Sequence, residues 1–164
     1  MKKPAYRTYF VLSTLVLSLT CLCCAVQALL LVLNRTAPPA DQATLSRQLE
    51  ERLEAARLAH TSVGALWNQI QSGERAACSD MPAEAPALFV MRADEQRVYP
   101  QLAAAASRLN DAIDQTQWAI QTWQSVCEQQ EAPPQSLIDG PACVERARQA
   151  LNEAAASLLA AQGR

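Results

Sequence analysis

Apolar residues recur every three or four positions along three stretches of the chain, at about residues 41–72, 100–130 and 141–162. This spacing places apolar side chains on one face of a helix and predicts three amphipathic helices. The stripe of the second stretch alternates steps of four and three without a break: Leu102, Ala106, Leu109, Ile113, Thr116, Ile120, Trp123, Cys127. Such spacing is typical of left-handed bundle packing. We therefore predict an all-α three-helix bundle over residues 41–164.

The residues between these stretches predict how the helices end and connect. Gly73 suits the position just after the first helix. The segment 132–140 holds prolines and a glycine that a continuous helix does not accept, so we expect the third helix to begin at Pro141. Antiparallel up-down-up order is the simplest topology for these connections.

A fourth apolar stretch precedes the bundle and carries no charge from Phe10 to Leu33. Residues 9–33 exceed the roughly 20 that a lipid hydrocarbon core requires, so we predict one transmembrane helix in contact with lipid. The residues 34–40, with Pro38-Pro39, form a linker. A cleaved signal peptide ending at Ala28 is the alternative. It would leave five apolar residues, Leu29 to Leu33, at the mature N-terminus, so we favour an uncleaved anchor.

The basic residues set the expected orientation. Lys2, Lys3 and Arg7 precede the apolar stretch, whereas Arg35 alone follows it closely. The positive-inside rule then makes residues 1–8 cytoplasmic and the bundle extracytoplasmic. The long connection 74–99 is expected at the end of the bundle far from the membrane. Its apolar run, Leu88 to Met91, has two interpretations: Phe89 closes the open end of the bundle, or Phe89 contacts a partner.

Charge and composition exclude several classes of function. Without Lys2, Lys3 and Arg7, 11 basic residues (14 − 3) stand against 16 acidic ones, a balance that argues against nucleic-acid binding. The chain has 4 glycines and no glycine-rich phosphate loop, which excludes a Rossmann or P-loop enzyme. We expect no catalytic residue, no cofactor and no metal site, and hence no enzyme.

Three cysteines lie outside the apolar stretch: Cys78, Cys127 and Cys143. In an antiparallel hairpin that turns at 132–140, Cys127 and Cys143 face each other, and an oxidising compartment would join them in a disulfide. Cys78 is left over. A free thiol, an intermolecular bridge and a different topology remain open for it.

Trp118 and His60 are the remaining candidates for function. Trp118 lies opposite the apolar stripe of its helix, so it either contacts a partner or packs on the third helix. His60, the single histidine, is expected near Asp114, and with Trp67 these residues form a candidate ligand site. A histidine satisfied at the edge of the core is the simpler interpretation.

These observations predict a non-enzymatic, single-pass membrane protein whose outer bundle binds a protein, as an accessory or assembly subunit. The partner would be another membrane or extracytoplasmic protein, or a second copy of the chain. The alternative is a membrane-anchored bundle that senses or binds a small ligand at His60, Trp67 and Asp114.

Overall fold

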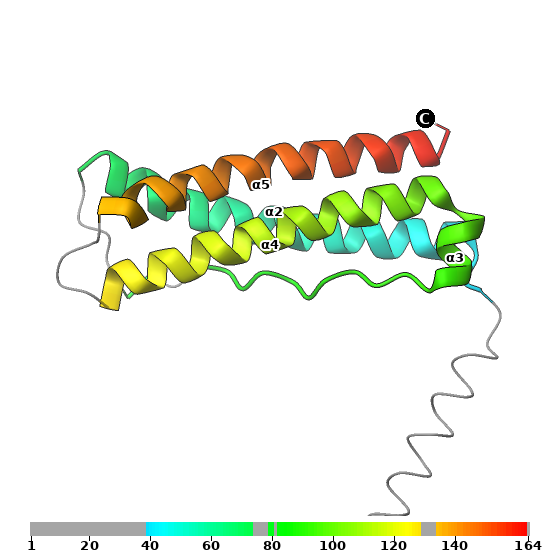
Figure 1. Ribbon diagram of the computed structural model, residues 1–164, viewed down its shortest axis with the longest axis horizontal. Helices are drawn as coiled ribbons and strands as arrows, with labels where there is room; N and C mark the ends of the chain where they lie inside the picture. Colours follow the sequence, from blue (N-terminus) through cyan, green and yellow to red (C-terminus); the bar gives the residue numbers. More distant parts are fainter. Residues whose placement is uncertain (1–38, 74–78, 81, 129–133, 164) are drawn as a thin grey trace, which may run out of the picture. The chain divides into compact units, whose positions relative to one another are not determined.

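Three long helices and one short helix account for the regular structure of the described residues (Figure 1). They are α2 (Gln42–Gln71), α3 (Ala93–Val98), α4 (Pro100–Glu128) and α5 (Pro134–Ala161). This is a computed structural model that describes residues 39–73, 79–80, 82–128 and 134–163. No strand occurs within these ranges, so the all-α prediction is confirmed for them.

Helix α2 begins and ends with the signals that the sequence carries. Asp41 is the N-cap, and its carboxylate accepts a hydrogen bond of 2.7 Å from the backbone N–H of Thr44. At the other end, Gly73 has a φ of 82° and its N–H donates to the carbonyl of Ile70. Only glycine adopts this conformation without strain, which explains why the helix stops there.

Helix α5 begins at Pro134, so the prediction of a start at Pro141 is wrong. Pro141 lies inside the helix, and Gly140 is buried against the indole of Trp67. Pro134 fits a first helical position because its missing N–H would have no partner there. Packing of Gly140 on Trp67 offsets the poor helix propensity of the Gly140-Pro141 pair.

The three long helices form a bundle, but not in the predicted order. Helix α5 is antiparallel to α2, because Gln42 Nε2 donates to the Ala161 carbonyl (2.9 Å) and a His60 ring nitrogen lies 3.0 Å from the Val144 carbonyl. It is also antiparallel to α4, because Arg108 lies 3.3 Å from Glu153, whereas Gln115, later in α4, lies 2.8 Å from Arg146, earlier in α5. Helices α2 and α4 therefore run parallel, and the up-down-up prediction is wrong (Figure 1).

The reason is the path of residues 82–92, which we name the return segment. It runs lengthwise along the bundle from the end of α2 to α3, where α4 begins (Figure 1). An extended chain advances about 3.3 Å per residue, so a connection of this length can span a long helix. The connection therefore does not form the predicted loop at one end of the bundle.

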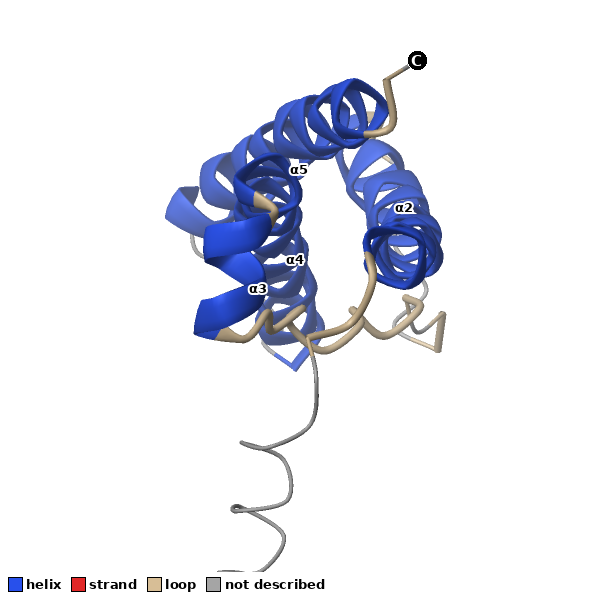
Figure 2. Cartoon of the chain, turned by 90° about the vertical axis from the view of Figure 1, so that its right-hand side faces the viewer, coloured by secondary structure: helices blue, strands red, loops and turns tan. Residues whose placement is uncertain are grey.

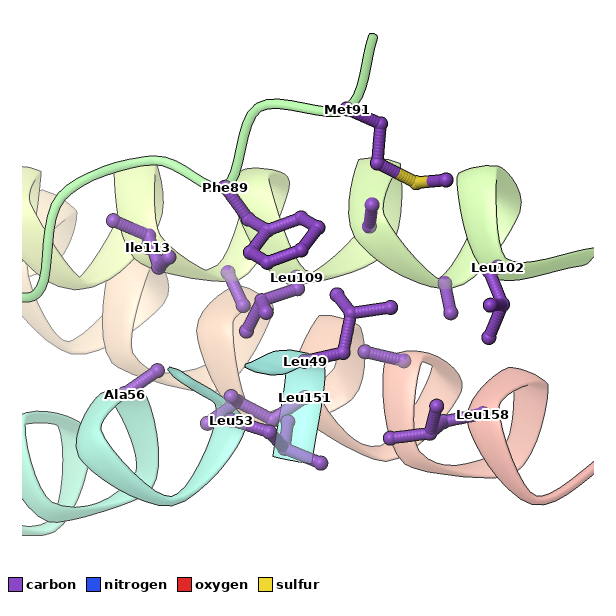
Figure 3. Close-up of a cluster of buried hydrophobic side chains, with 14 of the residues drawn as sticks. Leu49, Leu53, Ala56, Phe89, Met91, Leu102, Leu109, Ile113, Leu151 and Leu158 are labelled. Carbon is purple, nitrogen blue, oxygen red and sulfur yellow. The ribbon is translucent and has the colours of Figure 1, made fainter. Parts of the chain in front are cut away.

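The return segment completes the core. Phe89 and Met91 point inward and pack with Leu49, Leu53 and Leu109 (Figure 3). Seen along the bundle, this segment crosses between α2 and α4 on the side away from α5 (Figure 2). It thus takes the place that a fourth helix would occupy.

A second core cluster lies toward the C-terminal end of α2. Val63, Leu66 and Trp67 pack there against Ala119, Ile120, Trp123 and Cys143. Among the described residues, no helix has both the length and the apolar character needed to cross a membrane. The predicted segment 9–33 lies outside those residues.

Candidate functional site

Trp118 is a large apolar side chain on the outer face of α4. It is 62 % exposed, so it lies at the surface, as its position opposite the apolar stripe indicates, and its contact with a partner stays a prediction. Gln115 and Thr122 are one turn away on the same helix, and Thr122 Oγ1 donates to the Trp118 carbonyl (2.8 Å). The polar, uncharged neighbours leave the indole itself accessible.

A second exposed apolar side chain, Ile138, lies on α5, the helix that pairs with α4. Arg146 Nε donates to Gln115 Oε1 at 2.8 Å, which fixes the register of α4 against α5. With this register, Ile138, which is 64 % exposed, is offset along the bundle axis from the level of Trp118 by about 7.5 Å at a rise of 1.5 Å per residue. Both residues point away from the core. We name Trp118, Ile138, Gln115, Thr122 and Arg146 the Trp118 surface.

The two bundle cysteines are not joined to each other. Cys143 is a free, buried thiol, 5 % exposed, and the predicted Cys127–Cys143 bridge is therefore wrong. Arg146 Nη2 lies 3.0 Å from Cys143 Sγ. Cys127 is itself disulfide-bonded, and the bond is not to Cys143. The prediction failed because it assumed a hairpin turn at 132–140, where α5 has already begun.

The three residues of the candidate ligand site do not form an open site. Trp67 is 1 % exposed, and its Nε1 donates to the Ala119 carbonyl at 3.1 Å. Half-buried His60 is directed at the Val144 carbonyl of α5 rather than at Asp114, which is exposed on α4. The parallel course of α2 and α4 changes the neighbours that an antiparallel hairpin would have given His60.

The carboxylate next to Val144 belongs to a local ion pair. Glu145 accepts hydrogen bonds from Arg148 one turn later in α5. That guanidinium holds the pKa of Glu145 below its ordinary value, and Glu145 in turn raises the pKa of Arg148. Both groups are exposed, so the pair contributes little to stability. Within the described residues, no group of three or more His, Cys, Asp or Glu is placed to hold a metal ion.

Phe89, the second predicted partner contact, is 8 % exposed and belongs to the core. Its side chain points inward (Figure 3), so the prediction that Phe89 contacts a partner is wrong. Its neighbours Leu88 and Val90 are exposed instead, at 47 % and 85 %. They flank a groove of about 520 Å³ whose other wall is α2, with Gln48 and Arg52.

Sequence reasoning missed this groove because residues 87–91 are all apolar. A strand that is buried on one face usually alternates apolar and polar residues, and no such alternation marks this run. One local feature of the sequence does indicate an extended segment here: a short run that contains Phe and Val follows directly after Pro86.

Comparison with models of known protein families, with curated proteins and with solved structures finds no match to this chain.

Proposed function

We propose that this chain is a non-enzymatic, single-pass membrane protein whose extracytoplasmic helical bundle binds another protein, as an accessory or assembly subunit. The observation that carries the proposal is the exposure of Trp118, 62 % of whose surface lies open on a well-packed helix. Tryptophan is enriched at interface centres, where its large area is desolvated on binding. Ile138 extends the apolar area onto α5.

Two further observations support the membrane and compartment parts of the proposal. The uncharged stretch from Phe10 to Leu33 has the length and composition of a membrane anchor. The disulfide at Cys127 is consistent with an oxidising compartment, where such bonds persist. The basic residues of 1–8 favour a cytoplasmic N-terminus.

The test is recovery of the partner from the full-length chain in mild detergent. We expect one stoichiometric protein partner, lost at least tenfold on Trp118→Ala. Thermal unfolding should be nearly unchanged, because surface substitutions alter stability by about 0.5 kcal/mol or less. Leu58→Ala is the matched control, since Leu58 is a similarly exposed apolar residue (67 %) on α2.

Three results would contradict the proposal. Strong destabilisation by Trp118→Ala with unchanged partner recovery would assign Trp118 a structural role. A bound small molecule without any protein partner would favour the ligand-binding alternative. Release of the chain from membranes by carbonate, or a mature N-terminus at Leu29, would remove the anchor.

A further inference from the structure

The return segment has one edge bonded to the bundle and one edge open. Phe89 N–H donates to Asn110 Oδ1 (2.7 Å), and Asn110 Nδ2 donates to the Phe89 carbonyl (2.9 Å). Asn110 lies on α4, so both backbone groups of Phe89 point toward that helix. A neighbouring antiparallel strand would make the same two hydrogen bonds, one with the N–H and one with the C=O of a single residue.

The burial pattern shows that this part of the segment is extended. Phe89 and Met91 are buried, whereas Leu88 and Val90 are exposed, and a period of two belongs to an extended chain. Figure 3 shows Phe89 and Met91 on the same, inward side of the trace.

In an extended chain the backbone groups of adjacent residues point to opposite edges. The N–H and C=O groups of Leu88 and Val90 therefore point away from Asn110, toward the groove that separates the segment from α2. None of these groups has a hydrogen-bond partner among the described residues. An open strand edge of this kind is a template for pairing with another extended chain.

The opposite wall of the groove supplies a charge. Arg52 is half-buried in that wall and forms no ion pair with the described residues. Glu51 also lines the groove, and its carboxylate lies 3.9 Å from Arg47 Nε rather than in a contact with Arg52. Arg52 is therefore placed to receive a carboxylate, and its planar guanidinium can bind one in a bidentate manner.

We propose that the groove binds an extended peptide segment of a partner protein, which adds as a strand to the Leu88–Val90 edge and sets a carboxylate beside Arg52. Main-chain bonds to Leu88 and Val90 would provide affinity, and Arg52 would provide selectivity for an acidic side chain or a C-terminus. The volume of about 520 Å³ lies within the range of ordinary ligand sites. The proposal rests on the proposed function, because it specifies how the bundle binds protein.

A single peptide segment fits this groove better than a second copy of the chain. In a symmetric dimer each copy would have to offer the same edge, and in each copy that edge faces the wall formed by its own α2. A free peptide segment brings no such wall. The unpaired charge of Arg52 also calls for a carboxylate that the Leu88–Val90 edge of a second copy does not contain.

The test uses full-length protein in detergent micelles and a fluorescent eight-residue peptide of alternating Val and Thr. The peptide is made with a free C-terminal carboxylate and with an amidated C-terminus, and empty micelles report its binding to detergent. We expect the free acid to bind at least tenfold more tightly than the amide. Arg52→Gln should abolish that difference, so that both peptides bind with the weaker affinity that the amide has for the wild-type protein.

Backbone pairing is tested on the peptide and on the protein. Two peptides N-methylated at alternate residues, in complementary positions, should differ at least tenfold in affinity, because only one keeps the donors that face Leu88 and Val90. Val90→Pro removes a groove-facing N–H while φ remains suited to an extended chain, and should weaken binding at least tenfold. Ala87→Pro, whose lost N–H faces the other edge, is the matched control.

Several outcomes would overturn the proposal. No binding of the free acid beyond that to empty micelles would do so, as would equal affinity of the two N-methylated peptides. A dimer that Val90→Pro dissociates and the peptide displaces would make a second copy the occupant. If Val90→Pro impairs folding, the affinities of the two N-methylated peptides for the wild-type protein still test whether the peptide pairs with the Leu88–Val90 edge. Loss of the partner on Trp118→Ala without any peptide binding would leave the proposed function standing and refute the groove.

Discussion

The two buried tryptophans of this core differ in one hydrogen bond. Trp67 and Trp123 are each 1 % exposed and belong to the same cluster. Trp67 Nε1 is bonded to the Ala119 carbonyl, whereas Trp123 Nε1 is buried without a partner in the described part of the chain. A buried donor without a partner is itself destabilising.

We therefore expect Trp67→Phe to destabilise the protein more than Trp123→Phe, by about 1–3 kcal/mol. Both side chains are equally buried and each change removes one indole N–H, so the two losses of stability can be compared directly. Chemical denaturation followed by circular dichroism measures it. Equal losses would mean that the bond to Ala119 contributes nothing.

Two buried helical glycines differ in the space around them. A Cβ at Gly140 would overlap Cζ2 of Trp67, whereas a Cβ at Gly64 would lie 3.4 Å from Val144 Cγ1, an ordinary contact. Alanine favours helix over glycine by about 1 kcal/mol at either position. Overpacking in a core costs about 1–3 kcal/mol and outweighs that gain only at Gly140.

Gly140→Ala should therefore lower the free energy of unfolding, and Gly64→Ala should leave it unchanged or raise it by up to about 1 kcal/mol. Thermal unfolding of the two variants in parallel provides the measurement. A stable Gly140→Ala protein would show that α5 can move away from Trp67.

At the scale of elements, the N-terminus of α2 depends on one carboxylate. The Thr44 backbone N–H holds the pKa of Asp41 below its ordinary value by donating to the ionised side chain. Because the folded-state pKa is depressed, this contribution is complete above the unfolded pKa. It is lost as the pH falls through the folded value.

Asp41→Ala should consequently lower the free energy of unfolding at neutral pH. Below about pH 4, where an unfolded Asp is protonated, the difference in free energy of unfolding between Asp41→Ala and wild type should be smaller. Asp41→Asn keeps an acceptor for Thr44 and should retain most of the stability at both pH values. Denaturation curves at pH 7 and pH 3 distinguish the three proteins. An unchanged gap between wild type and Asp41→Ala would exclude this titration as the cause.

The helices were largely predictable, whereas the path between them was not. The unbroken stripe from Leu102 to Cys127 predicts α4 because helical periodicity is local information. The course of residues 82–92 depends on Asn110, Leu49 and Leu109, which are distant in sequence. The wrong topology then produced the wrong neighbours for His60. The early start of α5 was missed because Gly140 packs on Trp67, a contact that the sequence does not reveal.

On the scale of the whole molecule, the cysteines test the corrected arrangement. Cys143 is a free thiol, whereas Cys127 is disulfide-bonded. Denatured protein treated with iodoacetamide without reductant should be labelled at Cys143 and unlabelled at Cys127. Reduction before labelling should modify both. Peptide mapping provides the readout. A disulfide-linked peptide that joins Cys127 to Cys143 before reduction would contradict the free thiol at Cys143 and favour the predicted hairpin turn at 132–140.

The parallel course of α2 and α4 has a consequence for synthesis of the chain. Helix α2 leaves the ribosome early, yet Leu45 and Leu49 share their core cluster with Leu102, Leu158 and Ala161. Phe89 and α4 can cover part of this apolar surface earlier, but its partners on α5 emerge only when almost the whole domain has been made. Helices α4 and α5, adjacent in sequence, can pair as soon as both emerge, because short loops close readily. A nascent chain that stalls before Leu158 would therefore expose the part of the α2 stripe that α5 covers, which makes the chain a substrate for chaperones.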